Sequence, residues 1–362
     1  MADGRWRMAD GRWRMADGGW RMADGGWQMA DGGWQMADGG WQMADEGGNS
    51  DRSSSASVRV PLIVIVGPTA AGKTALSVRL AAALGGEIIS ADSRQIYRGM
   101  DIGAAKATAA ERGRVPHHLL DIVDPDRALT LAEYQTMAYT LIAEIHARGQ
   151  VPFLVGGAGQ YVRAVIEGWG IPKVAPQPAL RAELETQAAA AGSEALHARL
   201  AAWDPTAAAR IDHRNVRRVI RALEVCLVSG RPITELQRKT PPPYRILQIG
   251  VTRPRPELYA RIDARVDRMI ADGLVAEVER LAAAGYDWQL PAMSGLGYRQ
   301  IGQHLRGEIS LDEAIALIKR QTRRFVQQQY TWFRLDDPAI RWVDPGETPF
   351  EAVLALAHDF LA

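Results

Sequence analysis

The stretch LIVIVGPTAAGKTALSVRLAAAL, residues 62–84, decides the fold. It opens with apolar, mostly β-branched residues at 62–66, as in a buried strand of a parallel sheet. Residues 67–72 then turn the chain into an amphipathic helix that begins at Lys73 and Thr74. A strand, a G-x-x-x-x-G-K-S/T loop and a helix in this order indicate a site for a diphosphate or triphosphate. The pattern does not say what happens to the phosphate.

The loop offers three kinds of group to an anion. Its glycines let backbone N–H groups close on the anion, and the helix N-terminus adds the positive end of its dipole. The Lys73 ammonium supplies a point charge, and the Thr74 hydroxyl is a candidate ligand for Mg²⁺. The candidate binding residues are Gly67, Pro68, Thr69, Ala70, Ala71, Gly72, Lys73 and Thr74.

The composition is that of an ordinary globular protein, with 47% hydrophobic and 23% charged residues in a chain of 362. A formal net charge of +1 argues against a generic polyanion binder. The single cysteine, Cys226, excludes an internal disulfide framework, and its apolar neighbours predict a small buried residue in a reducing compartment. No apolar run reaches membrane-spanning length. We therefore expect a cytoplasmic protein that contacts no membrane.

Residues 1–49 repeat a unit of seven residues, from MADGRWR through MADGGWQ to a degraded MADEGGN. A period of seven suggests a coiled coil, but glycine in every unit opposes a stable helix. One interpretation is a tail whose regularly spaced aromatic residues contact a partner. We favour expanded coding sequence. Residues 1–57 are then a disordered tail, with translation beginning as late as Met43.

The second strand is expected at 87–90 and is followed by Asp92. In parallel sheets the carboxyl ends of the strands border the ligand crevice, so Asp92 should face the phosphate site. There it could bind Mg²⁺, act as a general base or cap the following turn. The residues alone leave capping and chemistry equally supported.

Further strands and helices alternate along the chain. Residues 130–148 predict a helix with Thr130 as N-cap and Glu133 at the capping-box position. QVPFLVGGAGQY, residues 150–161, and ILQIGVT, residues 246–252, predict two more buried strands. The pattern predicts an α/β fold, a P-loop NTPase-like parallel sheet flanked by helices. The catalytic core takes residues 58–172 and 244–345, and a C-terminal helix takes 346–362.

Between the halves of this core, residues 173–243 predict an all-helical insertion, rich in alanine and without strand signals. Within it, HRNVRRVIRALEV places most of four arginines on one side of a helix, opposite apolar residues. A solvated charged face is one interpretation. Because Glu224 is the only acidic residue nearby, we favour a surface that faces a polyanion.

The last third of the core carries basic residues on three predicted helices. Residues 256–281 predict one long helix, in which Asp263 and Asp267 could pair with its arginines, so a phosphate clamp is the lesser interpretation. SGLGYRQIGQHL, residues 294–305, predicts a glycine-hinged turn into a helix that exposes Tyr298 and Arg299. IKRQTRRFVQQQYTWFR, residues 318–334, mixes basic and aromatic residues, which suits either RNA stacking or core packing.

The motifs GPTAAGKT, DSRQIY, DIGAAK, PHHLLDI, VGGAGQY, GYRQ and TRRF…YTWFR occur in this order. This series resembles the tRNA dimethylallyltransferases over roughly residues 60–343. The resemblance implies transfer of a dimethylallyl group from dimethylallyl diphosphate to N6 of adenosine 37 in tRNA. The substrates would be tRNAs that read codons starting with U, and diphosphate would be released.

The resemblance also implies residue roles. The phosphate loop would bind the donor diphosphate, with Mg²⁺ as cofactor and Thr74 as its ligand. Thr69 and Arg265 would act at the leaving group, and Asp92 would be the general base. The partners would be dimethylallyl diphosphate and the tRNA anticodon stem-loop, and we expect a monomer. The expected tRNA contacts are Asp92, Ser93, Arg94, Gln95, Arg217, Arg218, Arg221, Gly297, Tyr298, Arg299, Arg323 and Arg324.

Two departures from the family pattern have consequences. Relatives usually have a threonine where this chain has Ala158, so a polar contact near the substrate is lost. The segment after Phe325 is usually basic, whereas here residues 327–329 are glutamines. Fewer cations predict weaker and less salt-dependent RNA binding in that region.

Three other functions compete. A small-molecule kinase would use ATP in the same loop, but it has no use for arginine faces on an insertion. An adenylate isopentenyltransferase shares the donor, but the insertion and the basic aromatic segment favour a macromolecular RNA. A non-catalytic RNA-binding module is opposed by the intact Lys73, Thr74 and Asp92.

Overall fold

The computed structural model describes residues 59–362 and six short strands within the first 43 residues. The chain divides into two compact units, residues 1–58 and 59–362. In the described residues, no helix combines the length and apolar character needed to cross a bilayer.

The first unit contains three antiparallel pairs of strands where disorder was expected. They are β1 (Arg7–Ala9) with β2 (Arg12–Arg14), β3 (Arg21–Ala23) with β4 (Gly26–Gln28), and β5 (Trp34–Ala37) with β6 (Gly40–Met43). Each pair is separated in sequence by Asp-Gly, the strongest short-range signal for a hairpin. The prediction of disorder considered glycine only as a residue that opposes a helix, and it did not consider that Asp-Gly favours a hairpin turn. For the rest of 1–57 the expected disorder lies outside the described residues.

The second unit is built on one sheet of six strands, all parallel, which confirms the predicted fold class. Their order is β12 (Ile340–Val343), β11 (Tyr244–Val251), β7 (Val60–Val66), β10 (Val151–Val155), β8 (Gly86–Ser90) and β9 (His117–His118). The strand that leads into the phosphate loop, β7, therefore lies at the centre.

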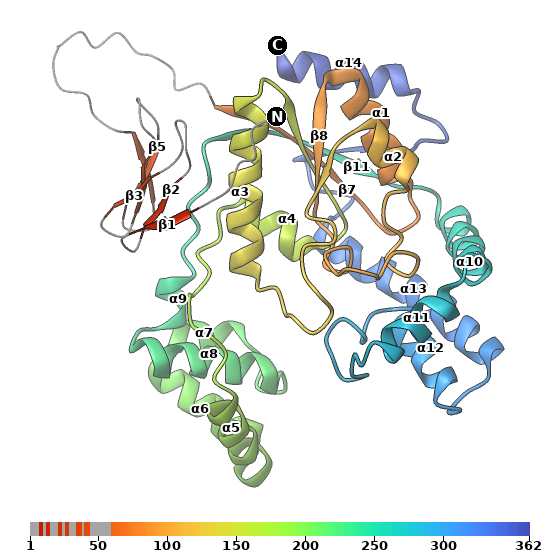
Figure 1. Cartoon of the computed structure of the whole chain (residues 1–362). Helices are drawn as coiled ribbons and strands as arrows, with labels where there is room; N and C mark the ends of the chain where they lie inside the picture. Colours follow the sequence, from red (N-terminus) through yellow and green to blue (C-terminus); the bar gives the residue numbers. More distant parts are fainter. Residues whose placement is uncertain are drawn as a thin grey trace, which may run out of the picture. The chain divides into compact units, whose positions relative to one another are not determined.

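Helices cover both faces of this sheet (Figure 1). The side chains of β7 alternate between the two faces. Ile63 and Ile65 pack with α1 (Lys73–Leu84) and with α14 (Phe350–Leu361), the C-terminal helix. Leu62, Val64 and Val66 pack with α3 (Leu131–Ala147) and α4 (Gly159–Ile166). Burial on both faces explains the unbroken apolar run in the sequence.

Five helices follow α4 and precede β11. They are α5 (Pro178–Ala191), α6 (Ser193–Trp203), α7 (Pro205–Arg210), α8 (Val216–Ser229) and α9 (Ile233–Leu236), coloured green in Figure 1. These helices fall within residues 173–243 and share a separate apolar core that includes Leu200 and Leu223. Cys226 is buried in this core as expected.

The single long helix expected over residues 256–281 is wrong. The chain forms α10 (Arg255–Ala271) and α11 (Leu274–Ala283), broken at Gly273, whose φ of 100° favours glycine. Next come α12 (Tyr298–Leu305) and α13 (Leu311–Trp332), while the short α2 (Ala109–Arg114) precedes β9. The N-cap of α3 is Thr130, with the predicted capping box to Glu133.

Candidate active site

The phosphate loop joins β7 to α1 with the geometry that its glycines allow. Gly67 has φ 138° and Gly72 has φ 112°, both in the region that disfavours side chains. A Cβ on Gly67 would lie 2.2 Å from the carbonyl oxygen of Val251, so the loop passes against the end of β11. The carbonyl oxygens of Ala70 and Ala71 accept hydrogen bonds from Arg261 and Arg253, at 2.9 and 3.2 Å.

The Lys73 ammonium is held inside this loop. Its Nζ donates to the carbonyl oxygen of Pro68 at 2.8 Å. Burial of the ammonium lowers the pKa of Lys73 to about 8, Asp92 opposes this shift, and the nearby charge of Arg265 adds to it. An anion bound here would face a cation that is already partly desolvated.

Asp92 follows the end of β8, as the sequence predicts. Its Oδ1 accepts a hydrogen bond from the backbone N–H of Arg94 at 2.8 Å, so the side chain does cap the turn. Among the described residues, this is the one hydrogen bond recorded for the carboxylate, and Oδ2 is left to accept another. The capping and chemical interpretations are therefore compatible.

Arg265 reaches the same space from α10. The two aspartates of this helix pair with α13: Asp263 with Arg323, and Asp267 with Lys319 at 2.6 Å. Neither aspartate neutralises Arg265, which has no hydrogen bond or ion pair within residues 59–362. Burial lowers the pKa of Arg265, and Asp92 opposes that shift. The guanidinium keeps its proton and is available to an anion.

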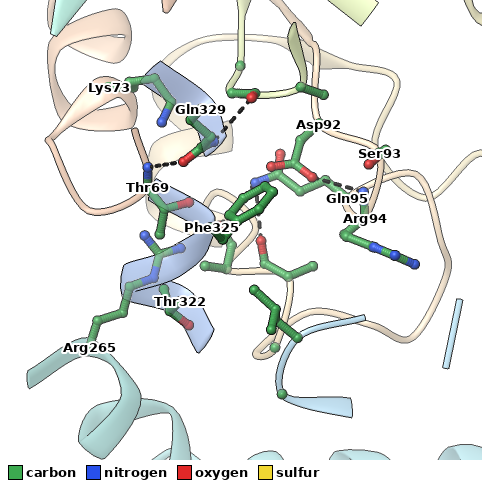
Figure 2. A pocket seen from close by; sticks show the side chains of 18 of the residues that line it. Thr69, Lys73, Asp92, Ser93, Arg94, Gln95, Arg265, Thr322, Phe325 and Gln329 are labelled. Atoms are coloured by element: carbon green, nitrogen blue, oxygen red, sulfur yellow. Dashed lines mark hydrogen bonds between the residues drawn. The ribbon is translucent and has the colours of Figure 1, made fainter. Parts of the chain in front are cut away.

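These groups line one cavity of about 810 Å³ (Figure 2). Thr69, Lys73 and Thr74 come from the phosphate loop, Asp92 from the end of β8 and Arg265 from α10. Ala158 lines it too, at the N-cap of α4, where it has no side chain to cap the helix. Ala158 therefore supplies no hydroxyl either to the cavity or to the N-terminus of α4.

The expected tRNA contacts fall into three groups. Lining the cavity are Asp92, Ser93, Arg94, Gln95, Gly297, Arg299 and Arg324. Some of these side chains also hold neighbouring loops: Arg94 donates to the carbonyl oxygen of Pro291 at 2.5 Å, and Gln95 donates to that of Ala105 at 3.2 Å. Tyr298 and Arg323 lie outside the cavity lining, and Arg217, Arg218 and Arg221 lie on α8.

The expected exposure of Tyr298 is wrong. The residue is 1% exposed, and its hydroxyl donates to Oε1 of the buried Glu277 at 2.7 Å. The Glu277 carboxylate also accepts the backbone N–H groups of residues 101–103, which fixes a loop at the cavity wall. Tyr298 therefore stabilises the cavity wall indirectly, through its hydrogen bond to Glu277. Arg323 is likewise engaged in its ion pair with Asp263.

The arginines of α8 divide in two. Arg217 and Arg218 are exposed, whereas Arg221 donates to Oε2 of Glu224 at 2.6 Å. Glu224 is 0% exposed and also binds Arg181. Burial alone would raise the pKa of Glu224, but its hydrogen bonds, including those from Arg181 and Arg221, lower it to about 2. Arg221 is thus paired with a buried residue of the insertion. Counting the acidic residues near the arginines in sequence did not predict this structural role.

Apart from Arg324, sequence reasoning missed the residues that α13 presents to the cavity. Thr322, Phe325 and Gln329 line it at spacings of three and four, and Gln321 and Gln328 flank the predicted Arg324 at the same spacings. This helical period was the available signal. Gln329 is buried and hydrogen-bonds to two loops, so one of the three glutamines taken as missing cations is structural.

A central parallel sheet, a phosphate-loop motif after its middle strand, and an acidic and a basic residue lining the same cavity place the chain in the phosphate-loop α/β class of enzymes. The model of the IPP transferase family matches residues 95–336. A tRNA dimethylallyltransferase of Roseiflexus sp. (strain RS-1) is 60% identical over 275 residues, 76% of this chain and 90% of that protein. The chain therefore belongs to the IPP transferase family.

Solved structures agree with this assignment. The tRNA isopentenylpyrophosphate transferase of Bacillus halodurans has a TM-score of 0.62 at 43% identity, over 84% of this chain and 96% of that one. A eukaryotic dimethylallyltransferase acting on tRNA shares the fold, with a TM-score of 0.73 at 24% identity, over 83% of this chain and 79% of that one.

Proposed function

We propose that this enzyme transfers a dimethylallyl group from dimethylallyl diphosphate to N6 of adenosine 37 in tRNA. The substrates are tRNAs that read codons starting with U. The observation that carries the proposal is that Asp92, Lys73 and Arg265 line one cavity. A base for the acceptor amine thus lies across from two cations for the leaving group. The names of the relatives suggest the reaction. The residues that line the cavity are of the kinds that this reaction needs.

The phosphate loop and Arg265 are suited to the donor diphosphate. Lys73 and Arg265 both face the cavity, and free backbone N–H groups at the start of α1 add their dipoles. The backbone N–H of Thr69 already donates to Gln329. It is therefore not among the loop N–H groups that would bind the diphosphate, although the sequence predicted that it would be. Charge develops on diphosphate as it departs, and preorganised cations stabilise that charge more than they do the bound donor.

The residues fit a magnesium ion that is held partly by substrate. Mg²⁺ prefers oxygen ligands and usually keeps several waters while binding one or two protein groups and phosphates. The Thr74 hydroxyl, beside Lys73 on the cavity wall, would be one such ligand. When bound, Mg²⁺ would offset negative charge on the diphosphate.

Asp92 is placed to serve the acceptor. The exocyclic amine of adenine is a poor nucleophile because its lone pair is delocalised into the ring. The free Oδ2 of Asp92 would accept a hydrogen bond from N6–H and take the proton as the N6–C1 bond forms. The C1–O bond breaks, and its electron pair leaves with the diphosphate. The proton then passes from Asp92 to solvent.

The tRNA must present this base outside a stack, because a base within a helix cannot bring its N6 to groups that line a cavity. Anticodon-loop bases are already unpaired, which lowers the cost of extruding one. Arg299 and Arg324 are exposed on the cavity lining and suit the neighbouring phosphates. Exposed Arg217 and Arg218 would add backbone contacts from the insertion. We expect the enzyme to act as a cytoplasmic monomer.

The test is transfer from radiolabelled dimethylallyl diphosphate, with tRNA carrying A36-A37-A38 and AMP offered in parallel. Label should appear on tRNA and be lost when A37 is replaced by G. Label on AMP alone would assign the chain to the adenylate isopentenyltransferases. Absence of label from both, together with release of phosphate from ATP, would favour a kinase.

A further inference from the structure

Gln329, in the last turn of α13, joins the two loops that end the central strands. Its Oε1 accepts a hydrogen bond from the backbone N–H of Thr69 at 2.8 Å, and its Nε2 donates to the carbonyl oxygen of Gly157 at 3.1 Å (Figure 2). Thr69 belongs to the phosphate loop after β7, and Gly157 to the turn after β10. These strands are neighbours in the sheet, so a single side chain bridges adjacent loops.

The surroundings hold this bridge firmly. Gln329 is 4% exposed, so its amide has little access to water. A Cβ on Gly157 would lie 2.3 Å from Nε2 of Gln329, which means that the close approach requires glycine there. Three residues further on, the carbonyl oxygen of Trp332 accepts a hydrogen bond from Arg163 of α4 at 2.6 Å, which docks the end of α13 beside the same turn.

The bridge needs one acceptor and one donor on the same flat group. An amide provides both, a carboxylate provides only acceptors, and a methionine of similar volume provides no donor and only a weak acceptor. A protonated carboxylic acid, by contrast, again offers a carbonyl acceptor and an O–H donor. The chemistry of position 329 can therefore be switched by pH in a glutamate variant.

We propose that Gln329 is a positioning residue, which sets the separation of the phosphate loop from the Gly157–Ala158 turn and so aligns the donor diphosphate with the acceptor. This inference rests on the proposed binding of diphosphate by the phosphate loop. A misplacement of about 1 Å in an active site can reduce a rate on the order of 100-fold. Loss of the bridge should act through donor use and leave tRNA affinity nearly unchanged.

The experiment compares Gln329→Glu, Gln329→Met and the exposed control Gln327→Glu in the full-length enzyme. The measured quantity is kcat/KM for dimethylallyl diphosphate at saturating tRNA, normalised to the unmodified enzyme at each pH from 6 to 8.5. We expect Gln329→Glu to lose about 10- to 100-fold at pH 8 and to recover as the pH falls. Burial raises the pKa of a carboxyl, which brings its protonation into this range. Gln329→Met should lose activity without recovery, and Gln327→Glu should match the unmodified enzyme.

Gly157→Ala covers the case in which a change at position 329 prevents folding, because it should displace the Gln329 amide and lower kcat/KM for the donor with position 329 unchanged. Where Gln329→Met folds, the double variant should cost little more than either change alone. Unmodified kcat/KM in Gln329→Glu at pH 8, or equal losses in both 329 variants at every pH, would overturn the inference. Full additivity of Gly157→Ala with Gln329→Met would also overturn it.

Lys73→Ala separates this inference from the function on which it rests. If Lys73→Ala leaves the KM for dimethylallyl diphosphate unchanged, the placement of diphosphate in the loop is wrong. If Lys73→Ala raises that KM while the Gln329 variants behave as the unmodified enzyme, only the role of Gln329 is wrong.

Discussion

The carboxylate of Asp263 pairs with Arg323 of α13 and leaves Arg265, two residues further along α10, without a partner among residues 59–362. The pairing links α13 to α10, and the half-buried Arg265 guanidinium lines the cavity without a neutralising partner in this part of the chain. A charge kept this way carries a desolvation cost that an anionic ligand would relieve.

Replacing Arg265 with alanine should therefore impair use of the donor. A hydrogen bond to a charged group contributes about 1.5–3 kcal/mol, so the KM for dimethylallyl diphosphate should rise about 10- to 100-fold. Arg268→Ala is the matched control, because Arg268 is exposed on the same helix and does not line the cavity. Steady-state kinetics at saturating tRNA would measure both. If Arg265→Ala and Arg268→Ala have equal KM values for dimethylallyl diphosphate, Arg265 does not bind the donor and its role is structural.

Asp92→Asn should slow the chemical step while leaving tRNA binding intact. The asparagine carbonyl can still accept from the N–H of Arg94, so the turn is kept, but the base is removed. General base catalysis contributes roughly 10²- to 10⁴-fold, and single-turnover rates should fall by that factor. The Kd for tRNA, from filter binding, should change less than twofold. A surviving rate with collapsed tRNA binding would contradict the assignment of the base.

Use of the donor should decline in alkaline solution because of Lys73. Its lowered pKa of about 8 means that the free enzyme loses this cation as the pH rises through 8. The charged form binds the diphosphate, so kcat/KM for the donor should fall about tenfold per pH unit above that point. Lys73→Arg retains its proton and should show no such fall, whatever its absolute activity. A persistent alkaline fall in Lys73→Arg would assign the titration to another group.

The arginines of α8 should separate into binding and stability roles. Arg217→Ala should weaken tRNA binding and reduce its salt slope by about 1, with an unchanged Tm. Arg221→Ala removes one partner of the buried Glu224, which should cost about 1–2 kcal/mol and lower Tm by roughly 2–5 °C. Thermal melts and tRNA titrations at several salt concentrations distinguish the two. A lower Tm in Arg217→Ala would indicate an unseen structural role.

Deleting residues 1–42, so that the chain begins at Met43, should leave prenyl transfer unchanged. The predicted site residues all lie between 67 and 324, outside the repeat. Comparing kcat/KM for both substrates in the two chains would check this expectation. A large loss in the shortened chain would show that the repeat contributes to substrate binding.

Local patterns predicted the features that depend on neighbouring residues. The apolar run before Gly67, the loop, α1 and the capping box at Thr130 each follow from short-range geometry. The position of Asp92 also followed, because parallel strands place their carboxyl ends at one edge of a sheet. The hairpins of the first unit were equally local and were missed only because their Asp-Gly signal was not considered.

The failures concern choices between distant partners. Asp263 lies two residues from both Arg261 and Arg265 on its own helix, yet it pairs with Arg323, 60 residues away in sequence. Tyr298 follows glycine in a motif of the family, but its ring packs in an apolar cluster with Met293 and Ile318, and its hydroxyl donates a hydrogen bond to Glu277. Packing between elements decides such pairings, and helical periodicity within one element does not contain that information.

The hydrogen bond from Thr69 to Gln329 spans 260 residues of chain and has a consequence for protein synthesis. The phosphate loop leaves the ribosome early, but Val251, Arg265 and Gln329, which pack against it or complete its cavity, are made much later. At about 5–20 residues per second, the interval is on the order of tens of seconds. A nascent chain therefore carries the loop for most of its translation without a competent donor site, and a truncated product ending before α13 would have no means of completing it.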